Sequence, residues 1–128
     1  MTPERFRQGM TLQAYVDQME INRERFDAAL RETTLTPADH AVLGRLGSPR
    51  YVLVITEDWC GTSLMCVPFT AKLVEAHPEI ELRVFLRDAN PDVMDRYLKR
   101  GVYRSIPVIV FFDEHMTELA RYIEERPV

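Results

Sequence analysis

The residues best suited to chemistry lie in the stretch 57–68, which contains both cysteines of the chain. Cys60 follows Trp59 and comes shortly after an apolar run, 51–55, that predicts a buried strand. From Phe69 onward, apolar residues recur at helical spacing. Cys60 is therefore expected at the junction between a strand and a helix.

A cysteine at the beginning of a helix is chemically activated. The first backbone N–H groups of a helix have no intrahelical acceptor, and the helix dipole favours an anion beside them. Such a position commonly lowers the pKa of a cysteine from about 8.5 into the range of roughly 3.5–7.5, and the thiolate is the nucleophile. We therefore expect Cys60 to be a reactive thiol and not a buried structural cysteine.

Two further side chains of this stretch could act with Cys60. Ser63 either donates a hydrogen bond to the thiolate from the first helical turn or serves only as a surface or capping hydroxyl. Cys66 is six positions away, which on an ideal helix separates the two Cα atoms by roughly 10 Å, whereas a disulfide needs less than about 7 Å. We expect Cys66 to stay reduced and to pack in the core. It remains a candidate resolving thiol if the helix opens, because Pro68 weakens that helix.

Three motifs in the chain resemble those of the thioredoxin family. The stretch 59–63, Trp-Cys-Gly-Thr-Ser, with Pro68 further on, is similar to the family's Trp-Cys-Gly-Pro-Cys turn and its helix proline. The stretch 104–112, in which Ile106 and Pro107 lead into an apolar run, is similar to the family's cis-proline and the strand after it. The stretch 87–91 is similar to the loop after the second core strand. The resemblance covers residues 50–122.

The resemblance implies a function with one main thiol. Cys60 would attack a disulfide-containing protein or accept a small thiol such as glutathione, and Trp59 would shape the site. Ile106, Pro107 and Arg104 would bind the partner. Ser63 stands where the family has its resolving cysteine, so an external thiol, or Cys66 after rearrangement, would release the mixed disulfide.

The sequence departs from the family pattern at another position as well. Val54 replaces the buried aspartate that assists proton transfer in thioredoxins. Two other functions therefore stay open. The chain could be a binding module that uses the groove around Pro107 without redox chemistry. It could also carry an iron–sulfur cluster held by Cys60 and an exogenous thiol across a dimer, by analogy with glutaredoxins that have one active-site cysteine.

Composition limits the compartment and the partners. The net charge of −4 offers no basic surface for nucleic acid. No apolar run approaches the roughly 20 residues that span a bilayer, and the N-terminus lacks an apolar signal segment. We expect a cytoplasmic protein without a membrane or nucleic-acid partner. We also expect no bound metal, because the three histidines are scattered and have no ligand spacing to a cysteine.

The expected fold is thioredoxin-like α/β in a single domain, 1–128, with an N-terminal helical extension, 1–49, and a core, 50–122. Two N-terminal helices are predicted, one over 12–31 capped by Thr11 and one beginning at Thr36 and Pro37. The core is a mixed sheet of four strands in the spatial order 80–87, 51–56, 107–112 and 117–122. Helices over 60–76 and 91–100 flank the sheet.

The end of the chain suggests association. The resemblance implies one more helix after the last strand, and the sequence stops without it. The strand 107–112 has no polar face, so the sheet needs another cover. We expect a homodimer with helix 12–31 in or near the interface. The alternative is that this helix covers the sheet of its own chain.

Overall fold

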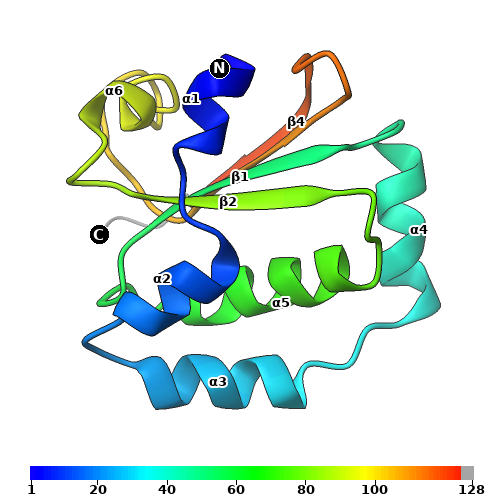
Figure 1. The fold of residues 1–128 in the computed structure, drawn as a ribbon, viewed down its shortest axis with the longest axis horizontal. Coiled ribbons are helices and arrows are strands. Elements are labelled where there is room, and N and C mark those ends of the chain that lie inside the picture. Colours follow the sequence, from blue (N-terminus) through cyan, green and yellow to red (C-terminus); the bar gives the residue numbers. More distant parts are fainter. Residues whose placement is uncertain (125–128) are drawn as a thin grey trace.

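The computed structural model describes residues 1–124 of the chain, and Figure 1 shows their arrangement. The helices are α1 (Pro3–Arg7), α2 (Leu12–Gln18), α3 (Arg23–Glu32), α4 (Pro37–Arg45), α5 (Ser63–Glu75) and α6 (Pro91–Met94). The strands are β1 (Tyr51–Thr56), β2 (Glu81–Leu86), β3 (Val108–Phe112) and β4 (Glu118–Ile123).

The four strands form one mixed sheet in the order β2-β1-β3-β4, which is the predicted order. β1 pairs with β2 in parallel, and Val54 lies opposite Val84. The pairs β1–β3 and β3–β4 are antiparallel. Parallel pairing needs a crossover between the two strands, and α5 supplies it.

Helices cover both faces of the sheet, as the apolar runs in its central strands require. In Figure 1, α5 lies beneath the sheet with α3 below it, and α1 and α6 lie above. Alternate residues of β1 face the two layers. Val52 and Val54 join the core on the α5 side, whereas Leu53 and Ile55 join the core that contains Phe6 of α1 and residues of α6.

The N-terminal region has four helices before β1, where the sequence predicted two. The predicted helix 12–31 is two helices, α2 and α3, separated by a bend at which Asn22 has a φ of 64°. The carboxylate of Asp58, which follows β1, accepts the backbone N–H groups of Glu20 and Ile21 at 3.0 and 3.3 Å. The helix ends there because a side chain distant in the sequence replaces the intrahelical acceptors.

Other boundaries agree with the sequence or differ for local reasons. Thr11 and Thr36 cap α2 and α4 as predicted, and Asp39 completes a capping box with Thr36. The helix predicted over 91–100 is confined to α6, which ends at Met94. Beyond it the chain turns, and Gly101 takes a φ of 72°, in the left-handed region that glycine adopts readily.

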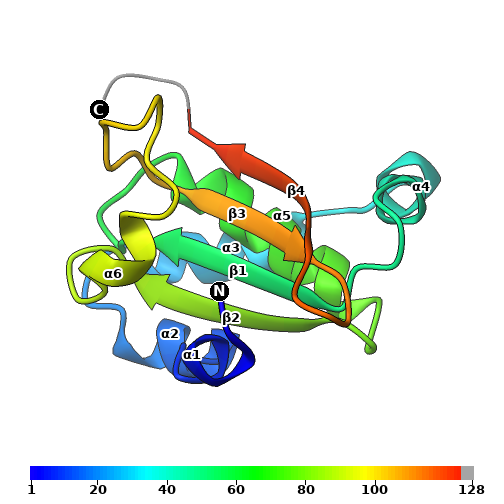
Figure 2. The same ribbon diagram turned by 90° about the horizontal axis from the view of Figure 1, so that it is seen from above.

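The N-terminal helices pack against their own chain. The segment between α1 and α2 pairs with the outer edge of β2, where Met10 and Val84 exchange two backbone hydrogen bonds of 2.8 and 2.7 Å. In Figure 2, α1 and α2 lie along the β2 side, whereas α4 lies at the opposite end from α6. The expectation about the chain end concerns residues 125–128, which lie outside the described residues. Within the described residues, no helix is long and apolar enough to cross a membrane.

Candidate active site around Cys60

Cys60 lies in the turn between β1 and α5, before the first helical residue, Ser63. Its side chain is buried, with 8% of the residue exposed, and it belongs to the core on the side of α6. The thiol donates a hydrogen bond to the backbone carbonyl of Ile106, with 3.7 Å between sulfur and oxygen. The turn that contains Cys60 and the segment that contains Ile106, both predicted as parts of the site, are therefore in contact.

The loop that carries this carbonyl leads directly into β3. The peptide bond between Ile106 and Pro107 is cis, and Ile106 is 1% exposed. Ser105 beside it is also buried. The predicted partner-binding residues Ile106 and Pro107 therefore form a buried wall next to the Cys60 thiol.

Ser63 is almost fully buried in the first turn of α5. Its Oγ lies 2.6 Å from Oγ1 of Thr56, which donates the hydrogen bond from the end of β1. The sequence left open whether Ser63 bonds the Cys60 thiolate or is a surface or capping hydroxyl, and in the structure it is buried with Thr56 as its hydrogen-bond partner. Sequence reasoning did not identify Thr56, because a threonine at the end of an apolar strand carries no distinguishing signal.

Tyr15 of α2 is a further residue near the site, and the sequence placed it only within the predicted helix 12–31. It is 1% exposed, and its hydroxyl lies close to the side chain of Thr56. Burial, together with the charges of Asp58, Glu57 and Cys60, raises the pKa of Tyr15 to about 12. Tyr15 is therefore uncharged near neutral pH, and its hydroxyl lies within electrostatic reach of the Cys60 thiol.

The outer rim of the site contains Trp59 and two arginines. Trp59 is 42% exposed, and the guanidinium carbon of Arg87 lies 5.0 Å from the centre of its ring. Arg87 also donates to the backbone carbonyl of Arg104 at 3.2 Å, which joins the loops after β2 and before β3. The side chain of Arg104 itself pairs with Asp95 at 3.0 Å. Through Arg87, the loops after β2 and before β3 both lie beside Trp59.

The two acidic residues that precede Trp59 have structural partners. Glu57 accepts the backbone N–H of Asp88 at 3.0 Å, which ties the β1–α5 loop to the loop after β2. Asp58 holds the bend between α2 and α3, and its own carbonyl accepts the side-chain amide of Asn22 at 2.9 Å. These contacts fix the backbone of the loop that carries Cys60.

Cys66 lies on α5 in a different environment. Neither cysteine forms a disulfide within the described residues, and Cys66 is half-buried against the core on the α5 side of the sheet. Its thiol is hydrogen-bonded to the hydroxyl of Tyr122 on β4. Burial and the neighbouring Cys66 and Glu124 raise the pKa of Tyr122. Cys66 therefore has a partner away from the Cys60 loop.

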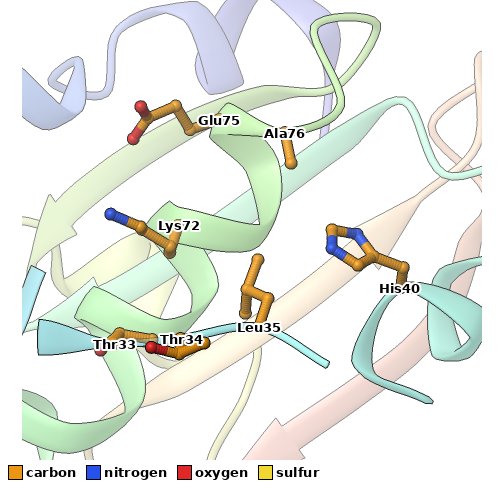
Figure 3. Close-up of a pocket in the computed structure, with 7 residues that line it drawn as sticks. All are labelled: Thr33, Thr34, Leu35, His40, Lys72, Glu75 and Ala76. Carbon is orange, nitrogen blue, oxygen red and sulfur yellow. The ribbon is translucent and has the colours of Figure 1, made fainter. Parts of the chain in front are cut away.

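A hollow at the opposite end of α5 contains none of the predicted site residues. Figure 3 shows it between α5 and the segment that leads into α4; its lining residues are Thr33, Thr34, Leu35, His40, Lys72, Glu75 and Ala76. Since α5 has 13 residues, its two ends lie about 20 Å apart. Within residues 1–124, no group of three or more histidine, cysteine or acidic side chains is arranged to hold a metal ion.

Most of the chain matches a known protein family. The family model described as thioredoxin matches residues 9–127 of the chain, so the match begins well before the motif-bearing part that the sequence identified. None of the curated proteins compared with the chain matches it.

Two solved structures share the fold. A crystal structure of a protein of unknown function from Pseudomonas aeruginosa has 22% sequence identity and a TM-score of 0.75, covering 95% of this chain and 75% of that one. A crystal structure of an HIV epitope scaffold has 21% identity and a TM-score of 0.73, covering 97% of this chain and 76% of that one. The family match over most of the chain, the shared fold and the position of Cys60 beside Pro107 lead to one conclusion: the chain belongs to the thioredoxin family.

Proposed function

We propose that this protein carries out thiol–disulfide exchange with Cys60 as its single nucleophilic thiol. The observation that carries the proposal is the position of Cys60, in the turn before α5, with its thiol 3.7 Å from the carbonyl of Ile106. Cys60 closely precedes the N-terminus of α5, where the helix dipole favours an anion.

The reaction has two exchange steps. The Cys60 thiolate attacks one sulfur of a disulfide, forms a mixed disulfide, and releases the other sulfur as a thiolate. A second thiolate, supplied by glutathione or another small thiol, then attacks the partner's sulfur in the mixed disulfide, forms a disulfide with it, and releases Cys60 as a thiolate. Trp59 and the wall formed by Ile106 and Pro107 would orient the partner chain during attack. Arg104 would contribute through its backbone, because its side chain pairs with Asp95.

A second candidate is a partner-binding role without redox chemistry. The observation that favours it is the burial of Cys60, which is 8% exposed and already has a hydrogen-bond acceptor for its thiol. Burial in apolar surroundings and an acceptor for S–H both favour the neutral form of a cysteine. The two candidates therefore differ in the measurable reactivity of one sulfur atom.

A challenge with glutathione disulfide separates them. We expect intact-protein mass spectrometry to show the addition of one glutathionyl group, peptide mapping to place it on Cys60, and dithiothreitol to remove it. The same treatment in denaturant serves as the control for accessibility, since both cysteines then react. Absence of the adduct on the folded protein, with reaction of the unfolded chain, would favour the binding role.

The homodimer expected from the sequence stays a prediction. α2 and α3 pack on their own chain, and four of the five residues of β3 are buried in it. Sedimentation equilibrium at micromolar concentration distinguishes a dimer from the 14.9 kDa chain.

A further inference from the structure

The loop between α6 and β3 contains the most basic stretch of the chain. Residues 96–104 read Arg-Tyr-Leu-Lys-Arg-Gly-Val-Tyr-Arg, with four basic side chains and no acidic one. The whole chain has a net charge of −4, so this stretch, here called the basic loop, is a local exception. In Figure 2 the basic loop lies beside α6, at the end of the sheet opposite α4.

The tip of the basic loop is a closed turn. Lys99 and Tyr103 exchange two backbone hydrogen bonds, of 2.8 and 3.0 Å. Between them, Arg100 and Gly101 have φ angles of 53° and 72°, which the left-handed turn requires. Because the backbone is already held in this turn, little conformational entropy would be lost at the loop when a partner binds.

The arginines of the basic loop are exposed, and two of them have no acidic partner. Arg96, Arg100 and Arg104 all have exposed side chains. Arg104 pairs with Asp95 at 3.0 Å. Within residues 1–124, no ion pair involves Arg96 or Arg100. Their charges therefore act on any anion that comes within the Debye length, about 8 Å at physiological ionic strength.

Two apolar side chains at the tip of the basic loop are exposed as well. Val102 is 68% exposed and Tyr103 is 58% exposed. Tyrosine and arginine are enriched in protein–protein interfaces, where the ring supplies contact area and the guanidinium binds carboxylates. A small anion would use the charges alone and leave these apolar side chains in water. The combination therefore fits an acidic polypeptide better than a small anionic molecule.

The basic loop is connected to the Cys60 site. It ends two residues before Ile106, whose carbonyl accepts the hydrogen bond of the Cys60 thiol. Arg87, which lies over the ring of Trp59, donates to the backbone carbonyl of Arg104 at 3.2 Å. A polypeptide whose disulfide reaches Cys60 therefore passes within a few residues of the basic loop.

The segments on the β2 side of Cys60 have the opposite charge. Glu57 and Asp58 precede Trp59 in the turn after β1, and Glu57 accepts the backbone N–H of Asp88 from the loop after β2. The one arginine between these acids, Arg87, pairs with Asp88 at 3.0 Å. Acidic residues of a partner would therefore be repelled on this side and attracted on the side of the basic loop.

We propose that the basic loop is a docking surface for an acidic segment of the protein whose disulfide Cys60 attacks. The docking surface depends on the exchange function proposed above and specifies its substrate class: a protein with acidic residues close to the reacting disulfide. The positive charges steer the encounter and orient the partner, which raises the rate of association. The bonds that form and break at sulfur are those already described for the exchange reaction.

The test compares three cysteine peptides that differ only in their flanking residues, which are glutamate, glutamine or lysine. Each cysteine carries a thiopyridyl group as a mixed disulfide, so attack by Cys60 on the peptide sulfur releases thiopyridone, which absorbance measures. Rates with mercaptoethanol correct for the intrinsic reactivity of each peptide, and mass spectrometry assigns the adduct to Cys60. We expect the glutamate peptide to react about tenfold faster than the glutamine peptide at low ionic strength. Most of this difference should disappear in about 1 M salt, where the Debye length falls to about 3 Å.

Variants locate the attraction on the basic loop. Arg96→Gln and Arg100→Gln each remove one exposed charge, and each should lower the ratio of the glutamate rate to the glutamine rate by about threefold. Arg45→Gln removes the same charge from the C-terminal end of α4 and should leave this ratio unchanged. The double variant Arg96→Glu/Arg100→Glu should react faster with the lysine peptide than the wild type does. Misfolding cannot produce such a gain.

Two results would overturn the docking surface and leave the exchange function standing. In the first, Cys60 of the wild type reacts at the same corrected rate with all three peptides. In the second, the glutamate peptide is preferred but the Arg96 and Arg100 variants keep the full preference, because the attraction then comes from other groups.

Failure of the exchange function gives a different result, in which Cys60 of the folded protein reacts with none of the peptides. Binding of a labelled glutamate peptide with serine in place of cysteine, measured by fluorescence anisotropy, then decides about the basic loop. Salt-sensitive binding that Arg96→Gln and Arg100→Gln both weaken would support the docking surface. Absence of binding would overturn it.

Discussion

The two ends of α5 have side chains of similar polarity in different surroundings. At the N-terminal end, Thr56 and Ser63 are buried and hydrogen-bonded to each other, and the Cys60 thiol reaches the Ile106 carbonyl. At the C-terminal end, ring nitrogens of His40 and His77 lie 3.1 Å apart, but both side chains are half-buried and line a second hollow between α4 and the end of α5.

The difference shows how position decides what a polar group can do. Electrostatic interactions and hydrogen bonds are stronger where water is excluded, and an unpaired polar group there is costly. The Cys60 end meets these conditions because loops from distant parts of the chain close over it. The histidine end leaves its groups in contact with water, which weakens their interactions. The following predictions test this contrast, from the largest expected effect to the smallest.

Replacing the Cys60 sulfur should have the largest effect. We expect Cys60→Ala to abolish mixed-disulfide formation with glutathione completely, because no other thiol lies in the turn before α5. Cys66→Ala is the matched control and should still form the adduct. Quantitative mass spectrometry measures both. If only Cys66→Ala lost the adduct, Cys66 would be the thiol that reacts with glutathione, and the prediction for Cys60 would be wrong.

The packing that supports the Cys60 end should be more costly to disturb than that at the other end. Phe26→Ala removes a ring that is 1% exposed and contacts Tyr15, so we expect a loss of about 3–5 kcal/mol in the free energy of unfolding. Val42→Ala on α4, at a residue 42% exposed, should change it by less than about 0.5 kcal/mol. Urea unfolding measures the free energy of unfolding of both variants. Equal losses would contradict the predicted difference between the two ends of α5.

Stability at high pH should depend on Tyr15. Burial raises the pKa of Tyr15 in the folded protein to about 12, above the ordinary tyrosine value of 10.0, so folding stabilises its protonated form. The resulting stability is fully present below pH 10 and is lost as the pH rises through 12, up to about 2–3 kcal/mol. Tyr15→Phe should therefore lose less stability than the wild type over this interval.

The control for this pH dependence is Tyr103→Phe, at a tyrosine that is 58% exposed. Its free energy of unfolding should follow the wild type across the same interval, because an exposed phenol gains little from folding. Chemical denaturation at a series of pH values measures all three proteins. A curve for Tyr15→Phe that is parallel to the wild type would show that the Tyr15 hydroxyl is accessible to water.

The smallest effect is expected at the rim of the site. Arg87→Gln removes the cation from the ring of Trp59, an interaction worth about 0.5–1 kcal/mol at an exposed position. Since the chain has one tryptophan, its fluorescence spectrum reports this contact alone. We expect a shifted spectrum for Arg87→Gln and an unchanged one for Arg45→Gln at the C-terminal end of α4. The reverse result would contradict the observed placement of Arg87.

Local patterns in the sequence were sufficient for the order of the strands and for the family. The apolar run of β1 and the alternation in β2 predicted strands, and Thr11 and Thr36 marked helix starts through their hydroxyls. The motif around Cys60 and the Ile106-Pro107 pair indicated the family. Each of these patterns involves residues that are close together in the sequence, so it can be recognised without knowledge of the tertiary structure.

The tertiary structure alone decided the surroundings of the thiol. Tyr15 lies within the helix that the sequence predicted over 12–31, and Thr56 is the last residue of a predicted strand. The two side chains lie close together although they are far apart along the chain. The break between α2 and α3 likewise depends on Asp58, distant in sequence. A hydrogen bond needs a partner at a defined distance and direction, and for these groups only the packing of helices on the sheet brings that partner into place.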